Sequence, residues 1–265
     1  MINHCRSLNI DYDTSSGLTT LAKMNHVSIV TKVYRNLEVT ALTTAGVRTN
    51  AVRAGDSAAF YEENGRFGTI NTIILINANL GYETLLDAFM TATEAKTVGL
   101  NDLRIPSQYS NGYATGTGTD GLCIFSNLES GNVITNAGKH SKLGELIGQC
   151  VIESVKEAIK KQVWISQKSQ SNVLVRLNRY SLDINEFYDN LGCDKFEFIK
   201  LLQKEMKKQD NVAVTSSVLN LIDEVECGLI EKDDALKLSK KILKENCNSY
   251  PIKKILEYWI NYFTH

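Results

Sequence analysis

Two kinds of apolar periodicity divide this chain. From Val27 to about Phe125, short runs of β-branched and apolar residues recur, which is typical of strands. These runs are VSIVTKVY, LEVTALTTAGV, TINTIILIN and LCIFSN. Between the third and fourth runs, from Leu80 to Leu103, six positions repeat at helical spacing, which predicts a helix packed on the sheet. The six are Leu86, Phe89, Met90, Thr93, Thr97 and Leu100.

The stretch from Leu143 to Ile159 has the clearest helical pattern and predicts a core helix. Its predicted buried face consists of Leu143, Leu146, Ile147, Cys150, Val151, Ser154, Val155, Ala158 and Ile159. Ser141 stands where an N-cap is expected, although Gly144 replaces the Glu or Gln of a full capping box.

Beyond about Trp164 the composition changes, because glycine becomes rare and short amphipathic patterns rich in Lys and Glu follow one another. Pro251 is expected to open the last helix, whose apolar stripe is Ile252, Ile255, Leu256, Trp259 and Ile260. We therefore predict an α+β domain over residues 1–163 and a helical C-terminal extension over 164–265. The sheet should be mostly antiparallel, since too few strands alternate with helices for a doubly wound parallel sheet.

Charge and composition favour a small-molecule ligand. With 29 basic and 30 acidic residues the formal net charge is −1, so no field attracts nucleic acid or an anionic membrane. The N-terminus lacks a signal-peptide pattern and no run approaches a membrane span, so we expect a soluble cytoplasmic protein. A homo-oligomer is compatible with the sequence.

Neither the cysteines nor the histidines form a metal-binding pattern. The six cysteines are far apart and contain no CxxC pair, so we expect reduced thiols. His4, His26 and His265 lack metal-ligand spacing to acidic or sulfur partners. We therefore expect no metal site built from protein ligands.

The run ATGTGTD, from Ala114 to Asp120, contains little apolar bulk and predicts a binding loop. Gly116 and Gly118 free the amides between them to form an anion nest or an oxyanion hole, and Thr115, Thr117 and Thr119 offer hydroxyls. The run is neither a phosphate P-loop nor GxGxxG. A plain glycine-rich turn between strands is the alternative, and Asp120 is either catalytic or structural.

Two upstream segments have the same polar character, namely TTAGVRTNAVRAGD from Thr43 to Asp56 and GTINTIILIN from Gly68 to Asn77. They contribute Asn50, Arg53 and Asn71 as candidate substrate-binding residues. Asp56 is a candidate catalyst because Gly55 beside it lets a ligand approach closely. Alternatively, Asp56 accepts the amides of a tight turn.

Glu94 and His140 are further candidate catalysts, and Lys96 is a further candidate substrate-binding residue. His140 precedes the strongest helix, whose dipole favours a neutral imidazole that can act as a general base, although a surface histidine fits equally well. Glu94 and Lys96 are two residues apart on a helix and therefore point in different directions. Each is commonly a solvated residue, but the threonines around Glu94 have poor helix propensity and suggest a functional reason.

Taken together, TTAGVRTNAVRAGD, GTINTIILIN, TATEAKT, ATGTGTD and AGKHSKLGELIG, in this order, resemble the adenosylcobinamide amidohydrolases of cobamide salvage. The resemblance covers roughly Val27 to Ile159. It implies hydrolysis of the amide that joins aminopropanol to the corrin side chain, releasing adenosylcobyric acid. It also implies that no cofactor is needed, since cobalt enters within the corrinoid, and that the macrocycle meets a broad apolar cleft.

The sequence leaves two mechanisms open. Either Asp56, Asp120 or His140 activates water while amides of residues 116–119 hold the oxyanion, or Thr117 or Thr119 attacks after His140 takes its proton. Water attack is favoured because the chain has no GxSxG nucleophile motif. Two other functions remain: a noncatalytic corrinoid carrier or sensor, and a hydrolase or transferase acting on a smaller amide.

Overall fold

The computed structural model describes residues 2–58, 69–180, 187–188 and 194–262. The chain divides into two compact units, Met1–Ser166 and Gln167–His265. The division therefore falls close to residue 163, where the composition changes. Gly68, the first residue of one motif, lies outside the described residues.

The first unit is built on a four-stranded sheet with the order β1-β2-β4-β7. Its strands are β1 (Ser28–Tyr34), β2 (Leu37–Thr44), β4 (Asn71–Ile76) and β7 (Gly121–Ser126). The first three are antiparallel neighbours, and β7 runs parallel to β4. All four predicted strands and the α+β class are confirmed.

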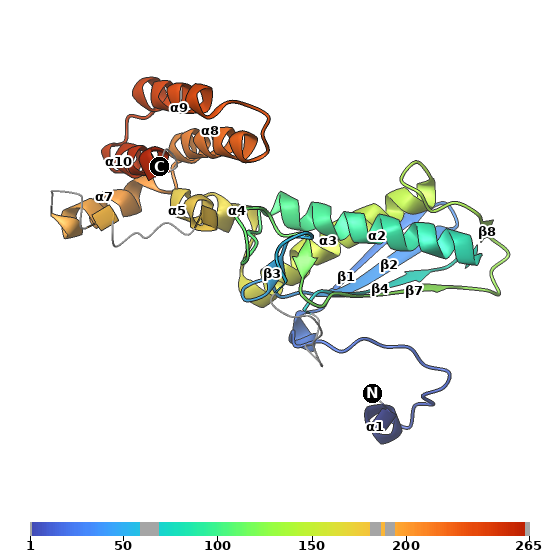
Figure 1. Ribbon diagram of the computed structural model, residues 1–265. Helices are drawn as coiled ribbons and strands as arrows, with labels where there is room; N and C mark the ends of the chain where they lie inside the picture. The colour runs from blue at the N-terminus through green and yellow to red at the C-terminus, as the bar shows by residue number, and fades with distance from the viewer. Residues whose placement is uncertain (1, 59–68, 181–186, 189–193, 263–265) are drawn as a thin grey trace. The chain divides into compact units, whose positions relative to one another are not determined.

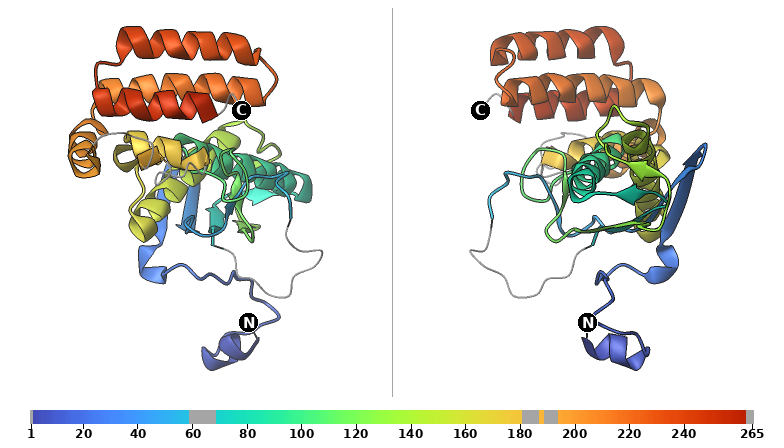
Figure 2. Two further views of the ribbon diagram at one scale, coloured as in Figure 1. Left: turned by 60° about the vertical axis from the view of Figure 1, so that its left-hand side comes forward. Right: turned by 90° about the vertical axis from the view of Figure 1, so that its right-hand side faces the viewer.

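Helices α2 (Tyr82–Asp102) and α3 (Lys142–Val163) cover the same face of this sheet (Figures 1 and 2). Every position predicted to face the core from α3 is buried. The Ser141 hydroxyl accepts a hydrogen bond from the Gly144 amide at 3.0 Å, which confirms the N-cap. A side chain at position 144 would lie 2.5 Å from the Ala137 carbonyl oxygen, so the Glu of a capping box does not fit there.

Helix α2 packs on the sheet as predicted, but most of its large apolar residues do not face the core. Leu86, Phe89 and Met90 are 67%, 48% and 60% exposed. The buried face instead carries Thr84, Ala88, Thr91, Ala92, Ala95, Gly99 and Leu100. Gly99 explains this choice, since a Cβ there would lie 3.3 Å from Val155 Cγ1 of α3. The two helices approach too closely for larger side chains between them.

Short elements complete the first unit. Strand β3 (Ala51–Val52) pairs antiparallel with β6 (Gly116–Thr117), and β5 (Asn79–Leu80) pairs parallel with β8 (Val133–Ile134). The N-terminal region contains α1 (Ile2–Ser7) and the 3-10 helix η1 (Met24–His26). These short pairs follow from contacts between loops, which hydrophobic periodicity does not reveal.

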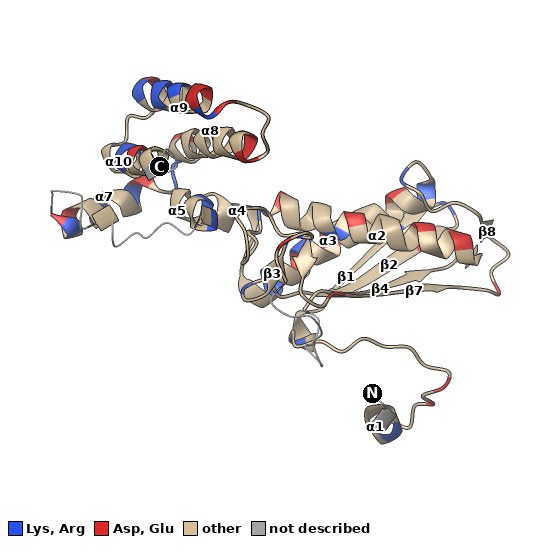
Figure 3. Ribbon diagram, in the orientation of Figure 1, with Lys and Arg blue, Asp and Glu red and all other residues tan. Residues whose placement is uncertain are grey.

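The described part of the second unit is helical, as predicted for the C-terminal extension. Its elements are α4 (Gln167–Gln170), α5 (Val173–Leu177), η2 (Asn178–Tyr180), α7 (Lys195–Glu205), α8 (Gln209–Glu226), α9 (Lys232–Asn246) and α10 (Tyr250–Tyr262). The predicted stripe of α10 is fully buried in a core of its own. Helices α8, α9 and α10 lie side by side (Figure 2), and α9 carries acidic residues at its start and basic residues beyond (Figure 3). Within the described residues, no helix is both long and apolar enough to span a membrane.

Candidate active site

The motifs predicted to form loops meet through strand pairing. In the β3–β6 pair, Ala51 lies opposite Thr117. The Gly118 amide donates to the Asn50 carbonyl oxygen at 3.1 Å, and the Ala54 amide donates to the Thr115 hydroxyl at 2.9 Å. The ATGTGTD loop is therefore joined along its length to the segment that contains Asn50 and Arg53.

Asp120 anchors a cluster with Thr117 and Lys96. The Thr117 hydroxyl donates to Asp120 Oδ1 at 2.6 Å, and the Thr117 amide lies 3.1 and 3.2 Å from the two carboxylate oxygens. Lys96 Nζ forms an ion pair with Asp120 Oδ2, and both side chains are 18% exposed. A Cβ at Gly116 would lie 2.9 Å from Lys96 Nζ, so glycine lets the loop backbone approach this pair.

The Lys96–Asp120 pair forms one wall of a cavity of about 220 Å³. Most other walls are apolar. The cavity is lined by Ile70, Thr72, Phe89, Ala92, Thr93, Lys96, Asp120, Gly121, Leu122 and Val151. Because Phe89 belongs both to this lining and to the exposed apolar side chains of α2, the cavity adjoins an apolar surface formed by Leu86, Phe89 and Met90, here called the α2 platform.

Asp56 lies in a turn with firm hydrogen-bond partners. Its Oδ2 accepts from the Arg53 amide at 3.0 Å and from the Ser107 hydroxyl at 2.6 Å. Burial raises the pKa of this carboxyl, but the Ser107, Ser110 and Arg53 hydrogen bonds and the Arg53 charge outweigh burial, so the pKa is lowered. Gly55 has a φ of +97°, which this turn requires. These hydrogen bonds hold Asp56 in its turn, and Asp56 does not line the cavity described above, so this geometry suits the turn role.

The two asparagines hold segments around the same loops. Asn71 Nδ2 donates to the Thr19 carbonyl oxygen at 2.7 Å, and Asn50 Nδ2 donates to the Thr69 hydroxyl at 2.8 Å. Two buried oxygens here, Asn50 Oδ1 and Thr119 Oγ1, have no hydrogen-bond partner among the described residues. Both therefore retain acceptor capacity beside the loop.

Glu94 and His140 lie outside this cluster. Glu94 pairs with Lys139 at 2.6 Å, while Lys96 pairs with Asp120, so the two helix residues point apart as predicted. Glu94 and His140 are exposed, and His140 makes no hydrogen bond or ion pair with any other described residue. Neither lines the cavity.

Two of the amides expected to hold an oxyanion are already occupied. The Thr117 amide donates to Asp120, and the Gly118 amide donates to Asn50. Lys96 supplies a positive charge on the cavity wall instead. Among the residues that the structure describes, no group of three or more His, Cys, Asp and Glu side chains could hold a metal ion.

Phe89, Thr93 and Leu122 contribute to the cavity but were not identified as site residues from the sequence. The sequence of α2 nevertheless contains a pattern that indicates two of these residues. Phe89 and Thr93 belong to the stripe of α2 that leads to Lys96, whereas the stripe of alanines and Gly99 carries no charge. A charged residue at the end of a large apolar stripe indicates that this stripe faces a ligand or solvent rather than the core.

The first unit resembles proteins of a known family. The family model described as adenosylcobinamide amidohydrolase matches residues 1–167. An uncharacterized protein of Methanocaldococcus jannaschii is 36% identical over an alignment of 161 residues, and the match covers 55% of this chain and 62% of that protein. An adenosylcobinamide amidohydrolase of Methanosarcina mazei is 30% identical over an alignment of 155 residues, and the match covers 55% of this chain and 66% of that protein.

The match therefore spans less than two thirds of each of these relatives. No solved structure matches the chain. The family match covers the whole first unit, including every motif around the cavity. The chain belongs to the adenosylcobinamide amidohydrolase family.

Proposed function

We propose that the first unit hydrolyses the amide bond between aminopropanol and the corrin side chain of adenosylcobinamide, giving adenosylcobyric acid. The observation that carries this proposal is the Lys96–Asp120 pair on the wall of an otherwise largely apolar cavity. Amide hydrolysis needs a base for water and a positive group for the oxyanion. Asp120 supplies the base and Lys96 supplies the positive group, and both lie beside an apolar surface.

Asp120 is the base in this mechanism. An ionised carboxylate has about four lone-pair sites. Three donors, the Thr117 amide and hydroxyl and the Lys96 ammonium, orient the carboxylate and leave acceptor capacity toward the cavity. Thr117 is 7% exposed and does not line the cavity, which favours an orienting role over nucleophilic attack.

The reaction balances with these groups. Asp120 takes a proton as water oxygen attacks the amide carbon, and the Lys96 ammonium stabilises the negative oxygen of the tetrahedral intermediate. The carbon–nitrogen bond then breaks as protonated Asp120 returns its proton to the departing amine. The products are the corrinoid carboxylic acid and aminopropanol.

The α2 platform is suited to the macrocycle. A cavity of about 220 Å³ accommodates the reacting amide and its aminopropanol but not a corrin ring. The exposed side chains of Leu86, Phe89 and Met90 offer an apolar surface beside it. Binding energy from this remote contact positions the amide at Asp120. Cobalt is part of the substrate and takes no role in this arrangement.

The test is incubation of the purified full-length chain with adenosylcobinamide, followed by mass spectrometry. We expect adenosylcobyric acid and aminopropanol in equal amounts. Lys96→Met should lower kcat by about 10²–10³-fold, as for loss of one oxyanion donor. Lys139→Met, which removes the exposed partner of Glu94, is the matched control and should leave kcat unchanged.

Different outcomes separate the competing functions. Tight binding of the corrinoid without product would indicate a carrier or sensor and contradict the hydrolase. Release of amine from smaller amides, with no thermal shift from cobinamide, would contradict the corrinoid substrate.

A further inference from the structure

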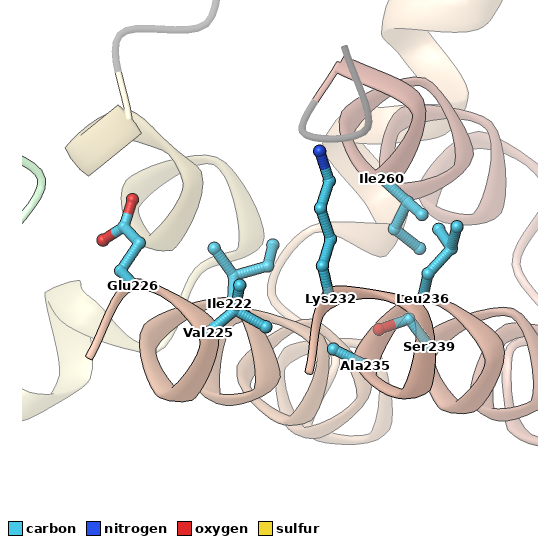
Figure 4. Close-up of a pocket in the computed structure, with 8 residues that line it drawn as sticks. All are labelled: Ile222, Val225, Glu226, Lys232, Ala235, Leu236, Ser239 and Ile260. Atoms are coloured by element: carbon cyan, nitrogen blue, oxygen red, sulfur yellow. The ribbon is translucent and has the colours of Figure 1, made fainter. Parts of the chain in front are cut away.

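Two apolar regions lie outside the candidate active site. The first is a cavity of about 220 Å³ between α8, α9 and α10 of the helical unit (Figure 4). Lys232 and Glu226 both border this cavity, so its charges favour neither an anion nor a cation. The second region is the face of the sheet in the first unit that lies opposite α2 and α3, here called the outer face.

The outer face carries apolar side chains in register. Two neighbouring rows run across all four strands. They consist of Ile29, Leu42, Ile73 and Cys123, and of Thr31, Thr40, Leu75 and Phe125. Ile29, Leu75 and Phe125 are 59%, 44% and 40% exposed. The Thr31 and Thr40 hydroxyls bond each other at 2.8 Å, so the second row has little unpaired polarity. In the described part of the first unit, no layer of helices covers these rows (Figures 1 and 2).

The outer face is also almost free of charge (Figure 3). Within the four strands, all of which the structure describes, only Lys32 and Glu38 are charged. Lys32 points to the other face, where it pairs with Glu153 of α3 at 2.6 Å. Glu38 lies at the rim, opposite Val33 and beside the turn between β1 and β2. Anionic membranes attract basic surfaces, so this face suits a protein partner instead.

The N-terminal segment covers one end of the outer face. Asn71 Nδ2 donates to the Thr19 carbonyl oxygen at 2.7 Å, and the Thr44 hydroxyl donates to the Thr20 hydroxyl at 3.3 Å. Thr44 and Asn71 are register partners on this face, two residues beyond Leu42 and Ile73. The preceding residues 2–17, here called the N-terminal arm, contain three exposed large apolar side chains. These are Leu8, Ile10 and Tyr12.

The size of the outer face favours a partner that covers the face and the arm together. Four strands about 4.8 Å apart, with six residues at about 3.4 Å each, give a footprint of roughly 400 Å². A stable interface buries about 800 Å² on each partner. The relief of the side chains and the arm can supply the remaining area. A second copy of the chain offers the same uncharged face and the same arm, and contact between identical patches is the usual interface of a two-fold dimer.

We propose that two copies of this chain associate through their outer faces and that the N-terminal arms extend this interface. The two sheets pack face to face and bury Ile29, Leu75 and Phe125 between them. The cavity with Lys96 and Asp120 lies on the helix-covered side of the sheet, so this proposal does not depend on the proposed hydrolysis.

Sedimentation equilibrium of the full-length chain over a range of concentrations tests the dimer, and we expect twice the mass of one chain. Leu75→Lys and Ile29→Lys should each raise the dissociation constant of the dimer at least about 100-fold, because two like charges meet in an apolar interface. Val98→Lys is the matched control, since Val98 is exposed to a similar extent as Leu75 but lies on α2, and it should leave the dimer unchanged. Because Ile29 is the more exposed residue, Ile29→Lys keeps the test valid if Leu75→Lys does not fold.

The arm and a thiol on the outer face provide two further readouts. Ile10→Ser should raise the dissociation constant about tenfold, because an apolar contact is lost. Cys123 should react with iodoacetamide more slowly in the dimer than after dilution to monomers. Cys227 is exposed in the second unit and should react equally in both states.

Three results would overturn the proposal. One is a monomer mass at every concentration, and another is a dimer that Leu75→Lys and Ile29→Lys leave unchanged. The third is slow alkylation of Cys123 in the monomer, which would mean that the chain covers its own outer face. An unchanged dimer in Ile10→Ser would remove the arm from the interface.

Discussion

Helices α2 and α3 cover the same face of one sheet, yet they bury different kinds of residue. Helix α3 buries large side chains such as Leu143, Ile147 and Ile159. Helix α2 buries mainly small ones and leaves Leu86 and Phe89 exposed. Both sequences have an apolar stripe at helical spacing, so periodicity alone does not reveal which stripe faces the core.

The difference shows how one helix can support a core and a surface at once. The small face of α2 brings its backbone close to α3, with Gly99 near Val155. Phe89 and Lys96 of the same helix line the cavity, where large side chains are needed to contact a ligand. Large apolar residues that fold stability does not require are available for ligand binding.

The largest expected effect on stability comes from α3. Ile147→Ala should lower the free energy of unfolding by about 2–5 kcal/mol, because Ile147 is fully buried and its removal leaves a cavity. Leu86→Ala on α2 is the matched change and should cost within about 0.5 kcal/mol. Urea unfolding measures both. Comparable losses would mean that the α2 platform is part of the core.

Phe89→Ala should act on binding rather than on stability. We expect the Kd for adenosylcobinamide to rise about tenfold, because the ring loses apolar contact with the macrocycle. Val98→Ala provides the control, since Val98 is similarly exposed at 43% but does not line the cavity. Calorimetric titration of both variants in the Asp120→Asn background, where turnover is slow and binding is retained, gives both values. An unchanged Kd in Phe89→Ala would remove the α2 platform from the substrate site.

A smaller effect is expected at the start of α3. Ser141→Ala removes the hydroxyl that accepts from the Gly144 amide and donates to the Gly138 carbonyl oxygen at 2.8 Å. The free energy of unfolding should fall by about 1 kcal/mol, a typical N-cap loss. Chemical denaturation would show this as a lower midpoint with an unchanged slope. No shift would mean that water replaces the cap at no cost.

The smallest effect is expected at the start of α2, which has no side-chain cap. Its N-cap Gly81 has extended backbone angles, and a Cβ there meets nothing within 4 Å. Gly81→Ser should therefore raise the free energy of unfolding by a few tenths of a kcal/mol. Thermal unfolding in parallel with the unchanged protein measures this, and a lower midpoint would contradict the expected cap.

Much of the fold follows from local patterns, but the site depends on contacts between distant residues. The strands, α3 and the buried stripe of α10 were predicted because alternation or helical spacing determines them directly. The exposure of Phe89 was not predicted from the sequence, because it depends on how closely α2 approaches α3. Likewise, the sequence indicated Asp120 and Asp56 equally as candidate catalysts. Only the fold brings Ser107 to Asp56 and Lys96 to Asp120.

The most direct test of the account compares Asp120→Asn with His140→Gln in single-turnover hydrolysis of adenosylcobinamide. Asp120 lines the cavity with Lys96, whereas His140 is exposed and does not line it. Asp120→Asn should slow product formation by about 10²–10⁴-fold with corrinoid binding retained, as for loss of a general base. His140→Gln should react at the unchanged rate. The opposite result, a large loss in His140→Gln and a normal rate in Asp120→Asn, would contradict the account.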